Sequence, residues 1–335
     1  MTHIGIVGTG VWATTLGILL SRTGNKTCLW SRDESRALEL ESARVNDRAV
    51  PGVEFPKLMS ISGALDKSLA CADLVIVAVP SVTLRENARK ISSSINSTSN
   101  IVCVTKGIEI ESGKRMTQIL AEELSEVNPN RIGALSGPNL APEIVAGYPA
   151  TATIAYPELK VAKEVQSLLS SDVFRLYRSD DVVGVELGGA LKNIVAIGAA
   201  FIDGIELGAN AKASFVTRGL HEITRLGVAM GARPDTFAGL SGMGDLVATC
   251  YSTISRNYRL GLGIASGKDL NSVLAELGQT AEGAPTTQAV VKLARQLNIE
   301  MPIADVTNSV LFEGRAPDTA IKELMGRMLQ PEVRY

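Results

Sequence analysis

Residues 4–13 have the sequence Ile-Gly-Ile-Val-Gly-Thr-Gly-Val-Trp-Ala, and they define the fold of the N-terminal half. The apolar run Ile4–Val7 predicts a buried strand that enters a glycine-rich turn and then a helix. Gly8 permits the tight bend, Gly10 lets backbone amides approach a pyrophosphate at the helix N-terminus, and the small Ala13 allows helix–strand packing. A plain glycine-rich turn is the alternative, but the strand–turn–helix context favours a dinucleotide-binding site.

A sheet is predicted from the runs that follow this unit. Strand-like apolar runs recur at residues 27–30, 58–61, 73–79, 101–105, 132–135, 150–154 and 173–176. The β-branched residues of the 73–79 run are typical of a strand buried on both faces of a parallel sheet. The last two runs flank a predicted helix at about residues 157–170, and we expect them to complete the sheet.

Polar residues directly follow three of the predicted strands. Pro80-Ser81, Lys106-Gly107 and Ser136-Gly-Pro138 each begin where an apolar run stops. Because open α/β sheets bind ligands at the carboxyl ends of their strands, we expect these three segments to line one crevice.

After Asp180 the pattern changes to helical periodicity. Helices are predicted at about residues 181–202, 210–230, 257–266, 281–298 and 302–312. The predicted fold class is therefore α/β, with an N-terminal Rossmann-like doubly wound sheet followed by an all-helical C-terminal domain. We predict a dinucleotide-binding domain at residues 1–179 and a helical substrate-binding and catalytic domain at residues 180–335.

Composition limits the partners of this chain. It has 335 residues, 45% of them hydrophobic and 20% charged, and a formal net charge of -2. No overall basic field exists to bind nucleic acid or an anionic membrane. No secretory signal is apparent, and charged or glycine residues interrupt each apolar run before the roughly 18 residues of a membrane span. The four cysteines are scattered, which favours a reducing cytoplasm.

The first predicted helix of the C-terminal half carries a lysine within a hydrophobic stretch, Gly184-Val-Glu-Leu-Gly-Gly-Ala-Leu-Lys192-Asn-Ile-Val-Ala-Ile-Gly198. Small residues occupy the positions four and eight residues before and after Lys192, so they share its helical face. Two interpretations are open. The lysine either reaches water along its stem from a tight helix–helix contact, or it is partly desolvated and exchanges a proton with a substrate.

The segment Ser31-Arg32-Asp33 follows the second predicted strand, where dinucleotide-binding folds usually carry a ribose-binding acid. Arg32 could hold a 2'-phosphate, and Asp33 could reach ribose hydroxyls. NADP(H) is therefore favoured as cofactor, with NAD(H) possible. The alternative for Arg32 is an ordinary surface arginine at a helix start.

A second polar cluster lies in the helical half, where Ser255-Arg256-Asn257 precedes a predicted helix. A capping hydroxyl, exposed amides and a guanidinium together make a phosphate-binding site, although capping alone would explain Ser255. Asp245, in a glycine-rich segment just before, is predicted to bind substrate hydroxyls or to orient Lys192. The alternative for Asp245 is a turn-forming loop residue.

Two other charged residues have more than one interpretation. Lys106 would disfavour protonation of Lys192 by like-charge repulsion if both lie in the same crevice. Glu282 has the position of a first-turn helix acid that interacts with the helix dipole. His3 begins a strand, and His221 has no carboxylate at ligand spacing, so no metal site is predicted.

Together these segments resemble the bacterial-type NAD(P)-dependent glycerol-3-phosphate dehydrogenase family. The matching motifs, in chain order, are Gly8-Thr-Gly-Val-Trp12, Pro80-Ser81, Thr105-Lys-Gly107, Ser136-Gly-Pro138, Leu187-Gly-Gly-Ala-Leu-Lys-Asn193, Asp203-Gly204, Gly208-Ala-Asn-Ala211, Thr217-Arg-Gly219, Gly242-Met-Gly-Asp-Leu246, Ser255-Arg-Asn257 and Glu282-Gly283. Each motif is short, but their order over nearly the whole chain makes the set specific.

The resemblance implies an oxidoreductase that interconverts dihydroxyacetone phosphate and sn-glycerol 3-phosphate for glycerophospholipid synthesis. It implies Lys192 as the proton-transferring residue. The substrate-binding residues implied are Lys106, Gly137, Asn139, Lys192, Asp245, Ser255, Arg256 and Asn257. The cofactor-binding residues implied are Gly8, Gly10, Val11, Trp12, Arg32, Lys106, Ala141, Arg256, Thr280 and Glu282.

This chain departs from the family pattern in the opening loop, where Val11 replaces a usual serine and Ala13 a usual glycine. A hydroxyl contact to the pyrophosphate would be lost, and we expect a lower cofactor affinity as a result. A homodimer is possible. Two alternative functions are a β-hydroxyacid dehydrogenase that acts on another substrate and a non-catalytic dinucleotide-sensing protein.

Overall fold

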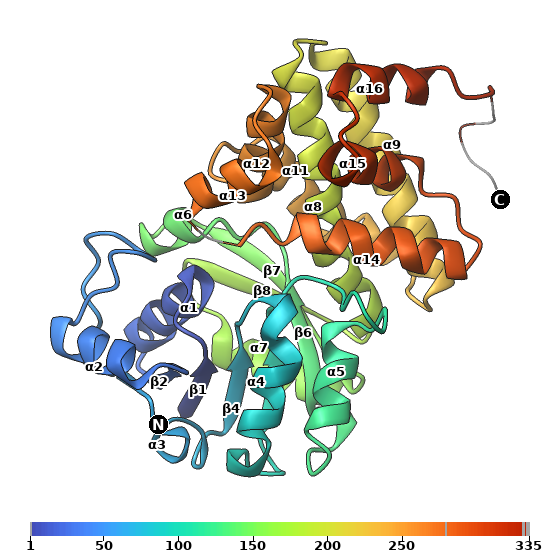
Figure 1. The fold of residues 1–335 in the computed structure, drawn as a ribbon. Helices are drawn as coiled ribbons and strands as arrows, with labels where there is room; N and C mark the ends of the chain where they lie inside the picture. The colour runs from blue at the N-terminus through green and yellow to red at the C-terminus, as the bar shows by residue number, and fades with distance from the viewer. Residues whose placement is uncertain (1, 279, 330–331, 333–335) are drawn as a thin grey trace.

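The computed structural model describes residues 2–278, 280–329 and 332. Its N-terminal half contains an eight-stranded sheet in the order β3-β2-β1-β4-β5-β6-β7-β8 (Figure 1). The strands are β1 (His3–Val7), β2 (Lys26–Trp30), β3 (Met59–Ser62), β4 (Leu74–Val77), β5 (Asn100–Cys103), β6 (Ile132–Ser136), β7 (Ala150–Ala155) and β8 (Phe174–Ser179). Each predicted strand is present, and the last two complete the sheet as expected.

Most strand pairs are parallel, and only β7 runs antiparallel to β6. Val7, at the end of β1, pairs with Trp30 on one side and with Val77 on the other. The carboxyl ends of β1, β2 and β4 therefore lie at the same edge of the sheet. The sheet is mixed rather than wholly parallel, and the predicted fold class is confirmed.

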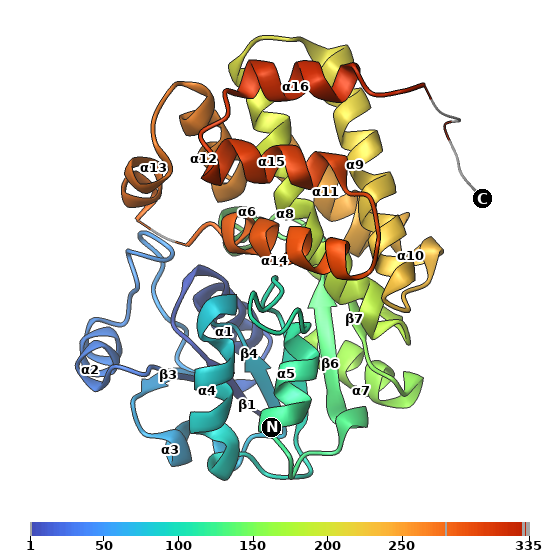
Figure 2. The same cartoon turned by 45° about the vertical axis from the view of Figure 1, so that its right-hand side comes forward.

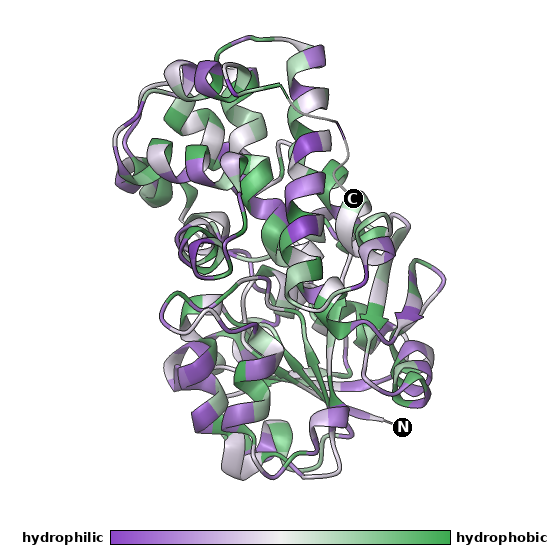
Figure 3. Ribbon diagram, turned by 90° about the vertical axis from the view of Figure 1, so that its right-hand side faces the viewer, coloured by the Kyte–Doolittle hydropathy of each residue, from purple (hydrophilic) through white to green (hydrophobic). Residues whose placement is uncertain are grey.

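Helices cover both faces of the sheet. They are α1 (Val11–Arg22), α2 (Glu34–Ala43), α3 (Leu65–Leu69), α4 (Leu84–Ile91), α5 (Met116–Glu123), α6 (Ala141–Val145) and α7 (Leu159–Leu169). Because side chains alternate along a strand, Ile6 packs in a cluster with Leu16 of α1, whereas Val7 packs in another with Leu84 of α4. This two-sided burial explains the continuous apolar strands, which are green in Figure 3.

The described residues after β8 form helices and turns only. They are α8 (Val182–Gly204), α9 (Ala209–Ala229), α10 (Pro234–Phe237), the π-helical turn η4 (Leu240–Gly244), α11 (Asp245–Cys250), α12 (Arg256–Ala265), α13 (Leu270–Leu277), α14 (Gly283–Gln296), α15 (Pro302–Phe312) and α16 (Pro317–Met325). The sequence did not predict α10, α11, α13 and α16, because helices this short carry little apolar periodicity.

The centre of the helical half is α8, against which α9, α11, α12, α14 and α15 pack. Every residue of α8 from Gly184 to Ile202 is buried. By length and composition alone α8 could cross a membrane, but its apolar window is wholly enclosed by the protein, so it is a core helix. Figures 1 and 2 place α14 along the boundary between the helical half and the sheet.

Candidate active site

One carboxylate joins the two halves at the carboxyl edge of the sheet. Lys106, three residues past β5, donates from Nζ to Oδ2 of Asp245 at 2.5 Å. Lys192 of α8 donates to the other oxygen, Oδ1, of the same carboxylate. Asp245, which begins α11, is only 1% exposed. The lysine from the helical half therefore meets the strand-end lysine through a shared buried anion.

Lys192 is held in one orientation. It is 7% exposed, and besides Asp245 its ammonium donates to Oγ1 of Thr249 at 2.5 Å. The Thr249 hydroxyl in turn donates to the backbone oxygen of Asp245 at 2.6 Å. The interpretation in which Lys192 extends to bulk water is therefore wrong. Asp245 lies in a helix and not in a turn-forming loop. Thr249 therefore lies one helical turn after Asp245, on the same face of α11.

The environment adjusts the acidity of Lys192. Burial disfavours the ammonium and, together with the nearby charge of Lys106, lowers the pKa of Lys192 to about 8, while Asp245 acts in the opposite direction. An amine with a pKa near 8 exists in both protonation states around neutral pH. It is therefore suited to general acid–base chemistry.

Two glycines of α8 allow this arrangement. A Cβ atom on Gly188 would lie 2.6 Å from the backbone oxygen of Ser241 in η4, and one on Gly189 would lie 2.1 Å from Oγ of Ser136. Neither distance is possible for real atoms, so only glycine lets η4 and the end of β6 pack directly on α8. The Ser136 hydroxyl also lies 3.4 Å from Oδ2 of Asp245.

The glycine-rich turn has the geometry of an anion-binding site. Gly8 adopts a φ of +119°, which favours glycine, and its amide donates to the Trp30 oxygen at 3.0 Å. Gly10 precedes α1, whose first amides receive no side-chain cap, and a Cβ there would meet nothing within 4 Å. The free amides and open space fit a dinucleotide pyrophosphate. Val11 and Trp12 form the first turn of α1.

Arg32 and Asp33 differ in how accessible their side chains are to a ligand. The Arg32 guanidinium is exposed and lies 3.7 Å from a Glu86 carboxylate that is also exposed. Asp33 caps α2 by accepting the Arg36 amide at 3.2 Å. Arg32 is therefore accessible to a ligand, whereas one oxygen of Asp33 is already used in the fold.

The Ser255-Arg256-Asn257 segment begins α12. The Ser255 hydroxyl accepts the Tyr258 amide at 3.2 Å, as expected for a helix cap. Oδ1 of buried Asn257 accepts the backbone amide of Gly283, at the start of α14, at 2.8 Å. This oxygen is therefore used within the fold and is not free to bind a ligand. Arg256 is exposed, and its guanidinium donates no hydrogen bond to another described residue.

Glu282 connects the helical half to the sheet, which the sequence did not predict. Its carboxylate, just before α14, accepts both the backbone amide of Ser81, at 3.2 Å, and the Ser81 hydroxyl. Burial raises the pKa of Glu282, while the bonds to Ser81 and the charge of Arg256 oppose this. The Pro80-Ser81 corner is therefore fixed against α14. Thr280, two residues earlier, is exposed.

The loop after β6 supplies three further predicted residues. A Cβ on Gly137 would lie 2.7 Å from Cα of Ala152, so this loop packs directly on β7. Asn139 donates to the Thr151 oxygen at 3.1 Å, and its own Oδ1 is buried without a hydrogen-bond partner. Ala141 begins α6. The unpaired oxygen is an acceptor available to a ligand donor.

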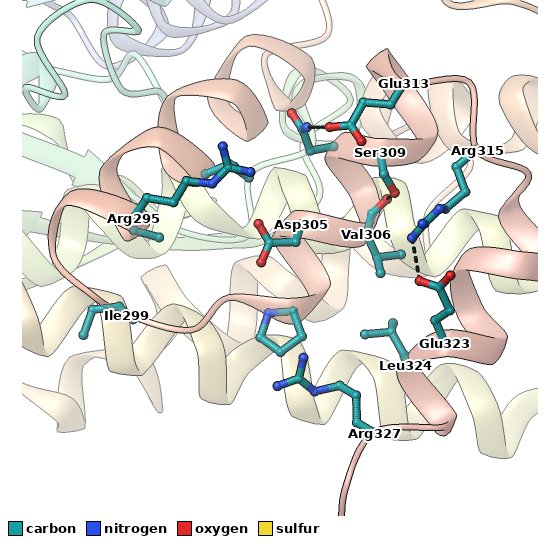
Figure 4. Close-up of a pocket in the computed structure, with 14 residues that line it drawn as sticks. Arg295, Ile299, Asp305, Val306, Ser309, Glu313, Arg315, Glu323, Leu324 and Arg327 are labelled. Atoms are coloured by element: carbon teal, nitrogen blue, oxygen red, sulfur yellow. Dashed lines mark hydrogen bonds and ion pairs between the residues drawn. The ribbon is translucent and has the colours of Figure 1, made fainter.

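A separate cavity of about 450 Å³ lies among α14, α15 and α16 (Figure 4). None of the predicted site residues lines it. Its charged groups are largely paired, with Arg315 2.5 Å from Glu323 and Arg327 3.1 Å from Glu300. Within the described part of the chain, no three His, Cys, Asp or Glu residues cluster as metal ligands would.

A sheet with a free glycine-rich turn after its first strand, and a buried lysine of the helical half joined to the lysine that follows β5, is typical of a dinucleotide-dependent oxidoreductase. Comparisons with known proteins give the family. Residues 3–162 match the N-terminal region of NAD-dependent glycerol-3-phosphate dehydrogenase, and residues 181–322 match its C-terminal region. The chain belongs to the NAD(P)-dependent glycerol-3-phosphate dehydrogenase family, which confirms the resemblance seen in the sequence.

Individual relatives span nearly the full length. Glycerol-3-phosphate dehydrogenase [NAD(P)+] of Chlorobium luteolum is 42% identical over 330 residues, covering 98% of this chain and 99% of the relative. The corresponding Pelotomaculum thermopropionicum protein is 43% identical over 324 residues, covering 97% and 93%. The crystal structure of glycerol-3-phosphate dehydrogenase from Coxiella burnetii has a TM-score of 0.93 at 35% identity, covering 97% and 99%.

Proposed function

We propose that this enzyme interconverts dihydroxyacetone phosphate and sn-glycerol 3-phosphate, with Lys192 as the general acid and base. The observation that carries the proposal is the buried Lys192 amine, bound through Asp245 to Lys106 at the carboxyl edge of the sheet. When bound, the nicotinamide dinucleotide supplies or accepts the hydride at the substrate carbon.

The protein controls the proton and the charge. In ketone reduction the Lys192 ammonium donates a proton to the substrate oxygen as negative charge develops there, and in alcohol oxidation the amine accepts it. Asp245 and Thr249 fix the direction of Nζ. Lys106 lowers the pKa of Lys192 and adds a second positive charge beside the reacting oxygen.

We assign binding roles by the same reasoning. Arg256 and the free amides at the start of α12 bind the substrate phosphate, next to Ser255 and Asn257. Gly137 and Asn139 complete the substrate side. The dinucleotide contacts Gly8, Gly10, Val11, Trp12, Arg32, Lys106, Ala141, Arg256, Thr280 and Glu282.

NADP(H) is our proposed preferred cofactor, because the exposed Arg32 guanidinium can pair with a 2'-phosphate. Apparent KM values for NADPH and NADH should differ in favour of NADPH, and Arg32→Ala should reduce that difference. Glu86→Gln should increase it, since Glu86 competes for Arg32. A preference for NADH in the unaltered enzyme would contradict this assignment.

The activity is tested by following NADPH or NADH oxidation spectrophotometrically with dihydroxyacetone phosphate. Lys192→Ala should lower kcat by roughly 10²- to 10⁴-fold, as expected when a general acid is lost. Arg256→Ala should chiefly raise KM for dihydroxyacetone phosphate. Near-normal kcat in the lysine variant would remove Lys192 from the mechanism, and no oxidation by the unaltered enzyme would favour a sensing role.

Several finer expectations rest on the sequence and on family membership. These are the division into domains at residues 179 and 180, a cytoplasmic location, a homodimeric state and a role of the product in glycerophospholipid synthesis. We also retain the expectation that the enzyme needs no metal.

A further inference from the structure

The helical half buries a second lysine that has no part in the proposed proton transfer. Lys212 of α9 is 7% exposed, and its ammonium pairs with the Asp203 carboxylate near the end of α8. Its Nζ lies 4.2 Å from the centre of the Tyr251 ring and 4.9 Å from that of Tyr258. The Tyr258 hydroxyl also donates to Asp203. One ammonium therefore holds a carboxylate and two aromatic rings.

The two tyrosines flank the proposed phosphate-binding segment. Tyr251 directly follows α11, which carries Asp245 and Thr249, and Tyr258 is in the first turn of α12. Between them, residues 252–255 form a turn in which Thr253 and Ile254 are exposed. Because the middle of this turn has little buried surface, the residues at its two ends contribute to its placement.

We propose that Lys212 and Asp203 are positioning residues that fix the 251–258 segment, and with it Arg256, for binding the substrate phosphate. This inference rests on the proposed function. Lys212 acts through the tyrosines and does not contact the phosphate, because its ammonium is occupied by Asp203 and by the faces of two rings. Burial and the adjacent Asp203 raise the pKa of Tyr258 to about 12, which keeps its hydroxyl protonated as a donor.

The test measures steady-state kinetics of four variants with dihydroxyacetone phosphate and with unphosphorylated dihydroxyacetone. Lys212→Met should raise KM for dihydroxyacetone phosphate by roughly tenfold, as expected from losing a desolvated cation–aromatic contact. The kcat should stay within about twofold, and KM for NADPH should change by a smaller factor than KM for dihydroxyacetone phosphate, because Arg256 is only one of several proposed dinucleotide contacts. Lys212→Arg should restore the low KM because it keeps the charge and the ring contacts. The surface ion-paired Lys268, changed to Met, is the matched control.

Tyr258→Phe provides a test that does not depend on burying an uncharged residue at position 212. It keeps the ring over Lys212 and removes only the hydroxyl bond to Asp203, so it should raise the same KM by a smaller factor. Activity with unphosphorylated dihydroxyacetone should not change in any of these variants, because that ketone has no phosphate for Arg256 to bind.

The outcomes separate this inference from the proposed function. If Arg256→Ala raises KM for dihydroxyacetone phosphate but neither Lys212→Met nor Tyr258→Phe does, the positioning role is wrong and the function stands. If kcat and the KM values of both substrates and of NADPH all change together, Lys212 has only a structural role and the proposal is also overturned. If Arg256→Ala itself leaves KM unchanged, the phosphate-binding site of the proposed function is wrong.

Discussion

At the scale of single residues, the candidate site depends on the carboxylate of Asp245. It is nearly inaccessible to water and binds the ammonium groups of Lys106 and Lys192 at the same time. A carboxylate between two ammonium groups accepts hydrogen bonds from both and holds both amines in fixed directions. The acidity of Lys192 is therefore set by burial and by two neighbours of opposite sign.

This balance predicts the pH dependence of catalysis. In the proposed mechanism ketone reduction uses the Lys192 ammonium, so kcat/KM for dihydroxyacetone phosphate should fall as pH rises through about 8, the pKa of Lys192. Alcohol oxidation needs the neutral amine, so kcat/KM for glycerol 3-phosphate should rise through the same pH. The measurement is kcat/KM in both reaction directions as a function of pH. A range of about pH 6 to 10 covers the titration of an amine with a pKa near 8.

Two variants should move this titration in opposite directions. Asp245→Asn removes the charge that favours the ammonium and should shift the midpoint to lower pH, whereas Lys106→Met removes a repelling charge and should shift it to higher pH. Shifts in the same direction, or a midpoint unaffected by both changes, would show that another group controls the profile.

A second residue-scale prediction concerns Glu222 in α9. This carboxylate is 6% exposed and accepts the Ile303 amide at 2.9 Å at the start of α15. Burial raises its pKa to about 7, well above the roughly 4.3 of an unfolded chain. The folded state therefore favours the protonated acid, and the stability associated with it is lost as pH rises through about 7.

Glu222→Gln should consequently stabilise the protein at high pH. The amide oxygen can still accept the Ile303 hydrogen bond, but no buried charge forms. At pH 9, above the pKa of both the folded and the unfolded state, the variant should gain up to about 4 kcal/mol in free energy of unfolding over the unaltered protein, because roughly 2.7 units separate the two pKa values. At pH 4, below the roughly 4.3 of the unfolded chain, the two should be nearly equal. Denaturant unfolding at both pH values measures this, with the exposed Glu276→Gln as control, and a variant less stable at pH 9 would contradict it.

At the scale of elements, α8 organises the helical half because its small residues let neighbours approach closely. Gly188 faces the η4 backbone, and Gly189 faces Ser136 at the end of β6. The small-residue face predicted from the sequence is therefore a packing surface, and it brings α11 with Asp245 against Lys192. Packing and catalytic geometry depend on the same helix.

Adding one methyl group at Gly188 should disturb both the packing of α8 and the geometry of the candidate site. In Gly188→Ala the new Cβ would meet backbone atoms of η4 at 2.6 and 2.9 Å, and backbone cannot rotate away as a flexible side chain can. The free energy of unfolding should fall by about 1–3 kcal/mol. kcat should also fall, since α11 must shift away from Lys192. Gly326→Ala, with 3.6 Å to its nearest neighbour, is the control and should be close to neutral in denaturant unfolding. Unchanged stability and kcat in Gly188→Ala would contradict the packing argument.

At the scale of the whole molecule, side chains of the helical half hold several segments of the sheet half. Glu186 of α8 binds the start of α5, accepting the Thr117 amide at 2.8 Å and Nη1 of Arg115 at 2.5 Å. Lys292 of α14 donates to the Glu111 oxygen at 3.0 Å, in the loop that begins near Lys106. With the Glu282–Ser81 contact, these bonds hold the segments that follow β4 and β5 against the helical half.

The Glu186 contact should contribute to overall stability. Glu186→Ala leaves the mostly buried Arg115 and Thr117 without their acceptor, and the free energy of unfolding should fall by about 3–5 kcal/mol. Glu276→Ala, which breaks an exposed pair with Lys268, should change it by less than about 1 kcal/mol. Chemical denaturation of both variants is the measurement, and equal losses would mean that Glu186 does not join the halves.

Much of the fold was predictable from local patterns. The order of strands and helices, the turn at Gly8 and the long helix with Lys192 follow from apolar periodicity and from residues with restricted backbones, because these signals lie within a few positions of each other. Most of the candidate site residues could be named because they belong to short motifs that resemble those of the family. Arg32, Asn139, Ala141 and Thr280 lie outside these motifs.

The side chains that these residues contact could be identified only from the tertiary structure. Asp245 binds Lys192 from 53 positions away and Lys106 from 139, and Glu282 binds Ser81 across 201 positions. No local pattern encodes which side chains meet over such separations. The pKa of Lys192 and the role of Thr249 follow from these long-range contacts. Lys192 becomes buried and gains the nearby charges of Asp245 and Lys106 only after the two halves have packed together.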